Sequence, residues 1–191
     1  MQVGVLALQG DFYLHKKMLT ELGVEVVEVR KPSDLEACQG LIIPGGESTT
    51  LVKLLKNIDL FDKLPDFNKR APIFGTCAGC ILVSAEVMNR PVESLNLIDI
   101  TTERNAYGRQ IDSFVDKVTL HLNHEKVKTE GVFIRAPKIS RVGESVKILG
   151  THQKEIVLVE NEKVLAATFH PELSGDTRIH RYFLEKITPG I

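Results

Sequence analysis

The chain has 191 residues and a mass of 21.3 kDa, the size of one compact domain that buries a large core without disulfides or metals. Apolar residues make up 43% and charged residues 26%, which is typical of a globular protein and excludes a disordered or fibrous chain. Lysine and arginine (24) nearly balance aspartate and glutamate (25), so the formal charge of −1 argues against a nucleic-acid binder with a broad basic face. We therefore expect a single domain over residues 1–191 that binds no nucleic acid.

The N-terminal run MQVGVLAL is apolar, but no basic segment precedes it and Asp11 ends it too early for a secretory signal. No apolar run approaches the ~18 residues that a membrane-spanning helix needs. Three cysteines, an odd number, without a secretory segment favour a reducing compartment. These observations predict a cytoplasmic protein that does not associate with membranes.

Short β-rich apolar runs alternate with helical patterns through the first half of the chain. Residues 3–8 predict a buried strand, and the apolar spacing over 11–22 predicts a helix that ends at Gly23. Further strands are predicted at 24–29, 40–44 and 72–75, with a helix after each of the last two, the second running to about residue 86. Because these strands are apolar on both faces and helices separate them, we expect a parallel sheet covered on both sides.

From about residue 97 the pattern changes, and closely spaced strand candidates follow with few helical signals between them. These candidates are 114–122, 131–135, 146–150, 155–160 and 164–169. They predict antiparallel additions and a return to the main sheet, and 176–187 predicts a closing helix. The predicted fold class is therefore α/β, with three layers and an open, mostly parallel sheet that carries antiparallel additions.

Four predicted strands end in small or polar residues. The segments at these ends are 9–10, 44–48, 75–79 and 170–172. Sites of open α/β sheets form outside the carboxyl ends of the parallel strands. We therefore expect the four segments to lie on one rim and to form a site there.

The segment Gly75-Thr76-Cys77-Ala78-Gly79 lies between a predicted strand and a predicted helix, and it is the thiol counterpart of the nucleophile elbow G-x-S-x-G. Small neighbours permit the sharp turn that leaves Cys77 exposed at its tip. The helix N-terminus behind Cys77 favours the thiolate, and the amide of Ala78 points to where an oxyanion would develop. The segment predicts a cysteine nucleophile; a buried cysteine in a small-residue turn is the alternative.

His170-Pro171-Glu172 follows the last predicted strand. A thiolate nucleophile needs a base, and the base needs an orienting group. If the backbone stays extended through Pro171, the side chains of His170 and Glu172 lie on the same side, and the carboxylate can hold the imidazole while its other nitrogen faces the thiol. The remaining histidines have no such neighbour in the sequence: His15, His121, His124, His152 and His180.

Two other interpretations use the same residues. Cys77 and Cys80 form a C-x-x-C after a strand, as in thioredoxin-like redox proteins, although the chain has no tryptophan. His121 and His124 together with the C-x-x-C suggest zinc, but about 40 residues separate the two pairs and no finger spacing results. We therefore expect no metal. The dithiol interpretation remains the alternative to a nucleophilic Cys77.

Candidate ligand-binding groups lie elsewhere. Residues 44–48 (PGGES) end a strand and open a helix, and paired glycines let backbone amides approach an anion or oxyanion. The phosphate-loop pattern G-x-x-x-x-G-K-[ST] is absent, and a tight turn capped by Ser48 is an equally good interpretation. Arg104 and Arg135 could bind a substrate carboxylate bidentately, although a single arginine more often forms a surface ion pair.

PGGES, GTCAG and FHPE, in this order, resemble the triad class of glutamine amidotransferases. Five longer segments restrict the resemblance to one family within this class. They are LALQGD at 6–11, PGGESTT at 44–50, ERNAYGRQIDSF at 103–114, GVFIRAP at 131–137 and FHPEL at 169–173. Together these segments are similar, over essentially the whole chain, to the glutaminase subunit of pyridoxal 5′-phosphate synthase, the PdxT family. GTCAG and HPE indicate only the superfamily, whereas RNAYGRQ and GVFIRAP are much more specific. The resemblance implies a flavodoxin-like class I glutamine amidotransferase fold.

The resemblance also implies roles for individual residues. Cys77 corresponds to the nucleophile, His170 to the general base and acid, and Glu172 to its orienting partner. The glutamine-binding positions correspond to Gly46, Glu47, Ser48, Arg104, Ile134 and Arg135.

The oxyanion hole of the family corresponds to backbone near Gly46 and to the amide of Ala78, with Gln9 close by. Two positions depart from the family pattern. Cys80 stands where leucine is usual, which puts redox inertness in doubt, and Leu14 stands where an acidic residue is usual, which puts local partner contacts in doubt.

By this resemblance, the Cys77 thiolate attacks the side-chain carboxamide of L-glutamine, ammonia leaves, and water hydrolyses a γ-glutamyl thioester to glutamate. The resemblance implies no cofactor in this chain. It implies a partner, a synthase subunit folded as a (β/α)₈ barrel, that receives the ammonia for pyridoxal 5′-phosphate (vitamin B6) biosynthesis. The alternatives are a dithiol oxidoreductase, an amidotransferase subunit of another pathway, and a non-catalytic module that retains the fold.

Overall fold

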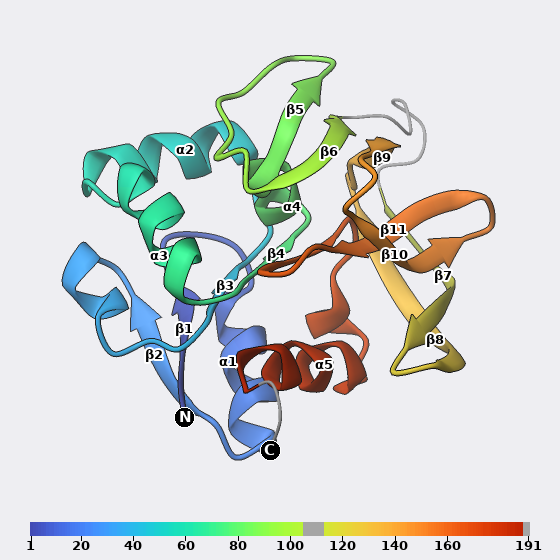
Figure 1. The fold of residues 1–191 in the computed structure, drawn as a ribbon, viewed down its shortest axis with the longest axis horizontal. Coiled ribbons are helices and arrows are strands. Elements are labelled where there is room, and N and C mark those ends of the chain that lie inside the picture. Colours follow the sequence, from blue (N-terminus) through green and yellow to red (C-terminus); the bar gives the residue numbers. More distant parts are fainter. Residues whose placement is uncertain (105–112, 189–191) are drawn as a thin grey trace.

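The computed structural model describes residues 1–104 and 113–188, and within these ranges helices pack around one mixed sheet (Figure 1). In chain order the elements are β1 (Gln2–Leu6), α1 (Phe12–Glu21), β2 (Glu25–Val29), β3 (Leu41–Ile43), α2 (Ser48–Asn57), α3 (Leu64–Arg70), β4 (Ile73–Thr76), α4 (Ala78–Val83), β5 (Ser84–Met88), β6 (Ile98–Glu103), β7 (Ser113–Leu122), β8 (Glu125–Ile134), β9 (Lys138–Val142), β10 (Lys147–His152), β11 (Glu155–Glu160), β12 (Val164–Ala167) and α5 (Arg178–Ile187). Short 3₁₀ turns lie between them, among them η3 (Pro171–Leu173).

The sheet has a parallel half and an antiparallel half. Its main order is β2-β1-β3-β4-β12-β11-β10-β7-β8, and the pairs from β2 to β12 are parallel. The pairs from β12 to β8 are antiparallel, and β5, β6 and β9 branch from β11. This confirms the predicted α/β class and its antiparallel additions, which are as extensive as the parallel part.

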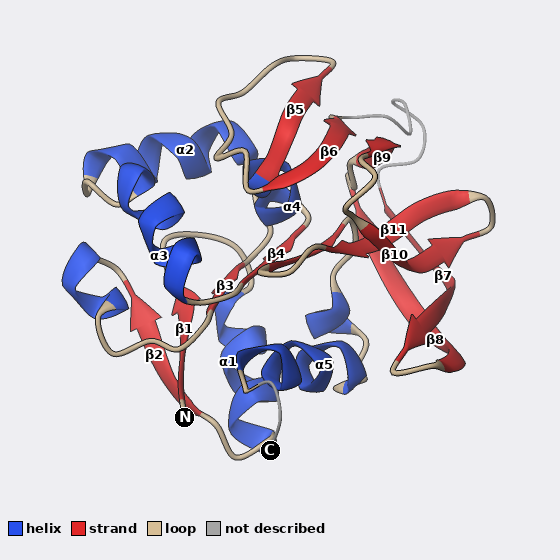
Figure 2. Cartoon of the chain, in the orientation of Figure 1, coloured by secondary structure: helices blue, strands red, loops and turns tan. Residues whose placement is uncertain are grey.

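Side chains of the parallel strands alternate between two cores. On β3, Leu41 and Ile43 pack among residues of α2, α3 and α4, whereas Ile42 packs among residues of α1 and α5. Figure 2 shows α2 and α3 on one side of the sheet and α1 and α5 on the other. The predicted cover on both faces is confirmed, because alternate residues of a strand point to opposite faces. In the described ranges no helix combines the length and the apolar character needed to span a bilayer.

The prediction for the helix after Cys77 was wrong in length. It was expected to reach about residue 86, but α4 ends at Val83 and β5 begins at Ser84. The hydroxyl of Ser84 donates to the carbonyl of Ile81 at 2.7 Å and lies 3.1 Å from the hydroxyl of Thr102 on β6. Pairing with a strand distant in the sequence therefore overrides the local helical pattern.

The turn between β4 and α4 depends on glycines. A Cβ on Gly79 would lie 2.1 Å from the carbonyl oxygen of Ile43, and one on Gly75 would lie 2.5 Å from the carbonyl oxygen of Gly79. Backbone on both sides leaves no room for a side chain. This close approach brings the start of α4 against the end of β3.

Replacing Gly79 with alanine is expected to lower the free energy of unfolding by about 3 kcal/mol, because the clash is with backbone that must shift. Denaturant unfolding of the variant measures the loss. Gly175→Ala is the matched control: its φ of +73° makes it strained, but no atom lies within 4 Å, so it should lose only about 1 kcal/mol. Equal losses in the two variants would refute the packing argument.

Candidate active site

The four predicted segments meet at one rim of the parallel half. Gly10 follows β1, Gly46 follows β3, Cys77 follows β4 and His170 follows β12, and all four line one cavity of about 440 Å³. The full lining is Gly10, Asp11, Gly46, Glu47, Ser48, Cys77, Ile81, Arg90, Arg104, Ile134, Arg135 and His170. The expectation of a shared site at the carboxyl ends of the strands is confirmed.

Cys77 stands on a strained turn between β4 and α4. The expectation that its side chain is exposed was wrong, because the residue is buried and only lines the wall of the cavity. Its backbone has φ +48° and ψ −103°, a conformation that residues with a side chain rarely adopt. The amide of Cys77 donates to the carbonyl of Ala167 at 2.9 Å, and its Sγ lies 3.8 Å from the carbonyl oxygen of Ile134. Strain of this kind, held by neighbouring strands, is characteristic of functional turns and of nucleophile elbows.

His170 and Glu172 are hydrogen-bonded through Nδ1 and Oε1 at 2.8 Å, and both side chains are buried. The expected route to this contact was wrong. Residues Pro171–Leu173 form the 3₁₀ turn η3 instead of extended backbone. The turn, which starts at a proline, folds the carboxylate back under the imidazole and leaves the other ring nitrogen for the cavity.

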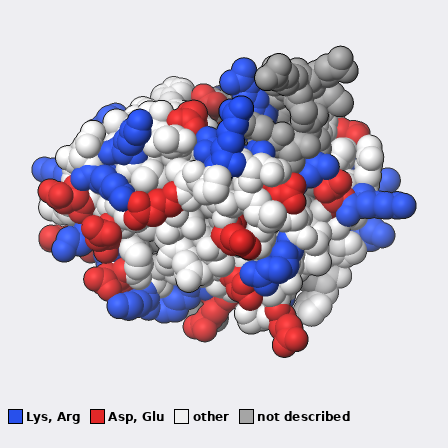
Figure 3. Space-filling view, turned by 90° about the horizontal axis from the view of Figure 1, so that it is seen from above, with Lys and Arg blue, Asp and Glu red and all other residues white. Residues whose placement is uncertain are grey.

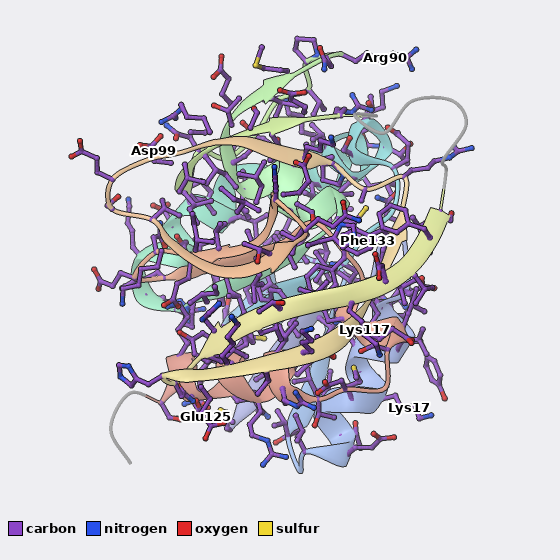
Figure 4. The ribbon with its side chains drawn as sticks, turned by 90° about the vertical axis from the view of Figure 1, so that its right-hand side faces the viewer. Lys17, Arg90, Asp99, Lys117, Glu125 and Phe133 are labelled. Carbon is purple, nitrogen blue, oxygen red and sulfur yellow. The ribbon has the colours of Figure 1, made fainter. Side chains whose placement is uncertain are left out.

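The long hairpin β7–β8 anchors this region (Figure 4). The amide of His170 donates to the carbonyl of Val132 on β8 at 2.8 Å. Next to this bond, the rings of Phe133 and Phe169 pack against each other with centroids 5.6 Å apart. Phe133 is fully buried. The hairpin thus fixes the backbone of His170 and also carries Ile134 to the cavity wall.

Charge within the site favours an ionised carboxylate beside a protonated imidazole. Burial would lower the pKa of His170, but its bonds to Cys77 and Glu172 outweigh burial and raise the pKa to about 10. Burial would raise the pKa of Glu172, but contacts with His15 and His170 hold it well below its usual range. At neutral pH His170 is therefore an imidazolium that can give up a proton.

The imidazole of His170 is expected to stay protonated through pH 7–8, where an ordinary histidine of pKa 6.5 has lost its proton. Because this pKa is higher in the folded chain, the group's contribution to stability is complete below about pH 6.5 and is lost as the pH rises through about 10. Titration of the His170 resonances by NMR measures the shift. Cys77→Ala should lower the pKa, and an unchanged value in that variant would contradict the pairing.

Glu47 is the N-cap of α2, whereas the alternative interpretation of this segment placed the cap at Ser48. Its carboxylate accepts from the amides of Thr49 and Thr50 at 3.0 and 2.7 Å. Burial would raise the pKa of Glu47, but these bonds lower it to about 2. Arg104 donates to the same carboxylate at 2.9 Å, so the two side chains form an ion pair at the cavity wall.

The loop after β3 packs directly on the catalytic candidates. A Cβ on Gly45 would lie 2.5 Å from Cε1 of His170 and 3.2 Å from Cβ of Cys77. Gly46 has φ +129°, and the side-chain amide of Gln9 donates to the carbonyl of Glu47 at 3.0 Å. The paired glycines are needed because backbone occupies the space beside the thiol, where its amides can face a ligand.

Cys80 does not behave as a partner thiol. It lies inside α4, is completely buried, and burial raises its pKa far above that of a reactive thiol. A group that resists ionisation is a poor member of a dithiol pair. The buried position of Cys80 suits packing, as the leucine expected from the family pattern would.

The sequence argument wrongly set His15 and His180 aside for lack of a neighbour. His15 lies 3.3 Å from Glu172 and 2.9 Å from His180, and both rings are fully buried. A signal existed, because His15 falls on the apolar stripe of its helix with Met18 and Leu19. A polar ring on such a stripe needs a buried partner.

Three further residues at the cavity were not predicted: Asp11, Ile81 and Arg90. Ligand atoms of Asp11, His170 and Glu172 lie within 4.8 Å of one another. Because His170 and Glu172 already bond each other, an ion there would compete with that bond. Residues 105–112, which hold most of the RNAYGRQ motif, lie outside the described residues.

The face seen in Figure 3 carries interspersed acidic and basic side chains, in keeping with the formal charge of −1. Among the residues drawn in colour, that face shows no broad basic surface. At the cavity wall, Glu47 and Arg104 form an ion pair.

Comparison with known proteins gives consistent similarities. The model of the SNO glutamine amidotransferase family matches residues 5–189. Pyridoxal 5′-phosphate synthase subunit PdxT of Thermosipho africanus is 51% identical over 98% of this chain and 99% of its own length, and that of Thermotoga maritima is 47% identical over 98% and 100%. A crystal structure of a glutamine amidotransferase superposes with a TM-score of 0.90 at 45% identity, covering 97% of this chain and 98% of that one. PurLQS from Thermotoga maritima, at 17% identity and a TM-score of 0.71 over 97% and 96%, shares the fold.

Proposed function

Because the chain belongs to the SNO glutamine amidotransferase family, we propose that it is the glutaminase subunit of pyridoxal 5′-phosphate synthase, with its glutaminase domain over residues 1–191. It hydrolyses L-glutamine to L-glutamate and ammonia and passes the ammonia to a synthase subunit. The observation that carries the proposal is that Cys77 and His170 meet at one cavity while Glu172 bonds His170 from behind, in a chain about half identical to PdxT proteins over nearly its whole length.

The reaction follows from these three groups. The thiolate of Cys77 attacks the carboxamide carbon of glutamine, and a carbon–sulfur bond forms. His170, held protonated by its neighbours, gives its proton to the departing nitrogen, so the carbon–nitrogen bond breaks and ammonia leaves. Water then attacks the thioester while His170 takes its proton, which releases glutamate and restores the thiolate. Glu172 keeps the imidazole oriented throughout.

Backbone amides stabilise the oxyanion of the tetrahedral intermediate. The amide of Ala78 begins α4 directly after the nucleophile, and the loop at Gly46 faces the same cavity. Donors already fixed by a helix start and a tight loop need no rearrangement when charge develops on oxygen. We assign the oxyanion hole to these two residues, with Gln9 holding the loop through its bond to Glu47.

Charged groups at the cavity wall suit the amino-acid end of glutamine. Arg104 and Arg135 offer guanidinium groups for the α-carboxylate, and the low pKa of Glu47 keeps a carboxylate available for the α-ammonium. Ile134 and Ser48 complete the wall between them and the thiol. With Gly46, these residues form the proposed glutamine-binding set.

Released ammonia is useful only where an acceptor receives it before it is protonated in bulk water. The proposal therefore includes a synthase subunit, which the resemblance describes as a (β/α)₈ barrel fed through an internal channel. The names of the relatives, which call them subunits of pyridoxal 5′-phosphate synthase, support such a partner. The chain itself requires no cofactor for hydrolysis.

Labelling with an electrophilic glutamine analogue tests the proposal, with intact mass and peptide mapping performed with and without the synthase subunit. We expect one adduct, on Cys77, that excess glutamine blocks. Cys80→Ala should label like the wild type, because that thiol takes no part. No adduct in either condition, or equal labelling of Cys38 and Cys80, would reject the glutaminase and favour the dithiol alternative.

A further inference from the structure

We propose that His15 is a positioning residue for glutamine hydrolysis, which holds the carboxylate of Glu172 and, through it, the imidazole of His170. The inference rests on the proposed function. One oxygen of Glu172, Oε1, is bonded to His170 at 2.8 Å, and the other, Oε2, faces Nε2 of His15 at 3.3 Å. The side chains of Glu172 and His15 are both fully buried.

The contact at 3.3 Å is longer than a strong charge-assisted hydrogen bond, which is ≈ 2.7–2.9 Å long. Oε2 forms no hydrogen bond within the described residues, so the ion-pair contact with Nε2 of His15 at 3.3 Å is what faces it there. A buried carboxylate oxygen left unpaired is costly and leaves the carboxylate free to rotate. His15 is thus the one described group that restrains this half of Glu172.

The neighbouring histidine orients the ring of His15. Burial lowers the pKa of His180 to about 3, so that ring is neutral and carries one N–H. Nε2 of His180 lies 2.9 Å from Nδ1 of His15, and the two nitrogens share one hydrogen bond. This bond fixes one side of the His15 ring and leaves its Nε2 toward Glu172.

The ring of His15 also contacts the nucleophile side of the site. Its Nε2 lies 3.3 Å from the hydroxyl of Thr76, the residue directly before Cys77. The ring of Phe74 packs edge-on against it, with centroids 6.3 Å apart. One buried imidazole on α1 therefore touches both the strand that carries the thiol and the carboxylate behind the base, so that it can keep the two in register.

Steady-state kinetics of glutamine hydrolysis test this role, measured on the complex of the chain with its synthase subunit. The kcat is divided by the number of active sites that the electrophilic analogue labels. His15→Leu should lower kcat about 10- to 100-fold, because small misplacement of a catalytic base is costly, and should leave KM within about twofold. His15→Gln, whose terminal amide can replace Nε2 as donor to Glu172, should recover most of kcat. The amide of His15→Asn is shorter and reaches His180 but not Glu172, so this variant should lose as much kcat as His15→Leu. It replaces His15→Leu in the experiment if the leucine variant does not fold.

Met18→Leu is the matched control, because Met18 is buried on the same face of α1 but bonds no member of the site. It should keep the wild-type kcat. Folded His15→Leu or His15→Asn protein with wild-type kcat per titrated site would overturn the inference, as would equal activities of the glutamine and asparagine variants. A wild-type complex without glutaminase activity would instead refute the proposed function, and the two failures are therefore distinguishable.

Discussion

Replacing Cys77 with alanine is expected to lower glutamine hydrolysis by about 10⁴-fold or more while the fold is retained. The substitution removes the sulfur that forms the thioester, and the described cavity offers no second thiol, because Cys80 is buried inside α4. Alanine occupies the same strained backbone at φ +48° without adding volume, so the turn should survive. Ammonia release at saturating glutamine, with the synthase subunit present, measures the loss.

Cys80→Ala is the control for this experiment, since it removes the neighbouring thiol and should keep most of the activity. Circular dichroism and denaturant unfolding of both variants separate a loss of chemistry from a loss of fold. If Cys77→Ala still released ammonia at a rate near that of the wild type, the nucleophile would have to be another group, and the triad would be wrong.

The second large effect is expected for His170→Asn, which should lower kcat by about 10³-fold or more, because members of a triad act as a unit. The variant removes the imidazolium, whose proton the leaving nitrogen needs. Glu172 keeps its contact with His15, so the buried carboxylate is not left without any partner. Single-turnover and steady-state ammonia release measure the loss.

His121→Asn is the matched control, since His121 is exposed on β7 and lies away from the described cavity. It should keep wild-type activity. A folded His170→Asn protein that retained more than about a tenth of the wild-type kcat would remove His170 from the proton transfer, because general acid–base catalysis contributes at least about 10²-fold.

The parallel core of the fold was predictable because its strands carry their signal locally. Residues such as Ile42 and Phe74 lie in short apolar runs that are buried on both faces, and helices with clear apolar spacing separate them. The strands β5, β6 and β9 were missed for the opposite reason. Ser84 on β5 and Thr102 on β6 bring their hydroxyls within 3.1 Å across the strand pair, a contact that the sequence of β5 alone does not indicate. The β-branched residues of Ile98–Glu103 did favour extended backbone, and this signal was overlooked.

The chemistry-bearing residues were predictable because a nucleophile on a strand-to-helix turn constrains its neighbours strongly. Only small residues fit beside Cys77, so the turn can be predicted from Gly75 and Gly79 in the sequence. His170 and Glu172 are two residues apart, so their pairing too is a local property, although the turn that pairs them is 3₁₀. The correct pair was therefore predicted from an incorrect backbone conformation.

By itself, then, the sequence predicted the candidate nucleophile, base and acid and the parallel core, since each prediction depends on residues that are neighbours along the chain. Only the tertiary structure decided that His15 lies against Glu172, because α1 and η3 are far apart in sequence. The place of His15 on the apolar stripe of its helix indicates a buried partner but does not identify it, and packing decides which residue that is. The same holds for Glu47, which meets Arg104 only through the fold.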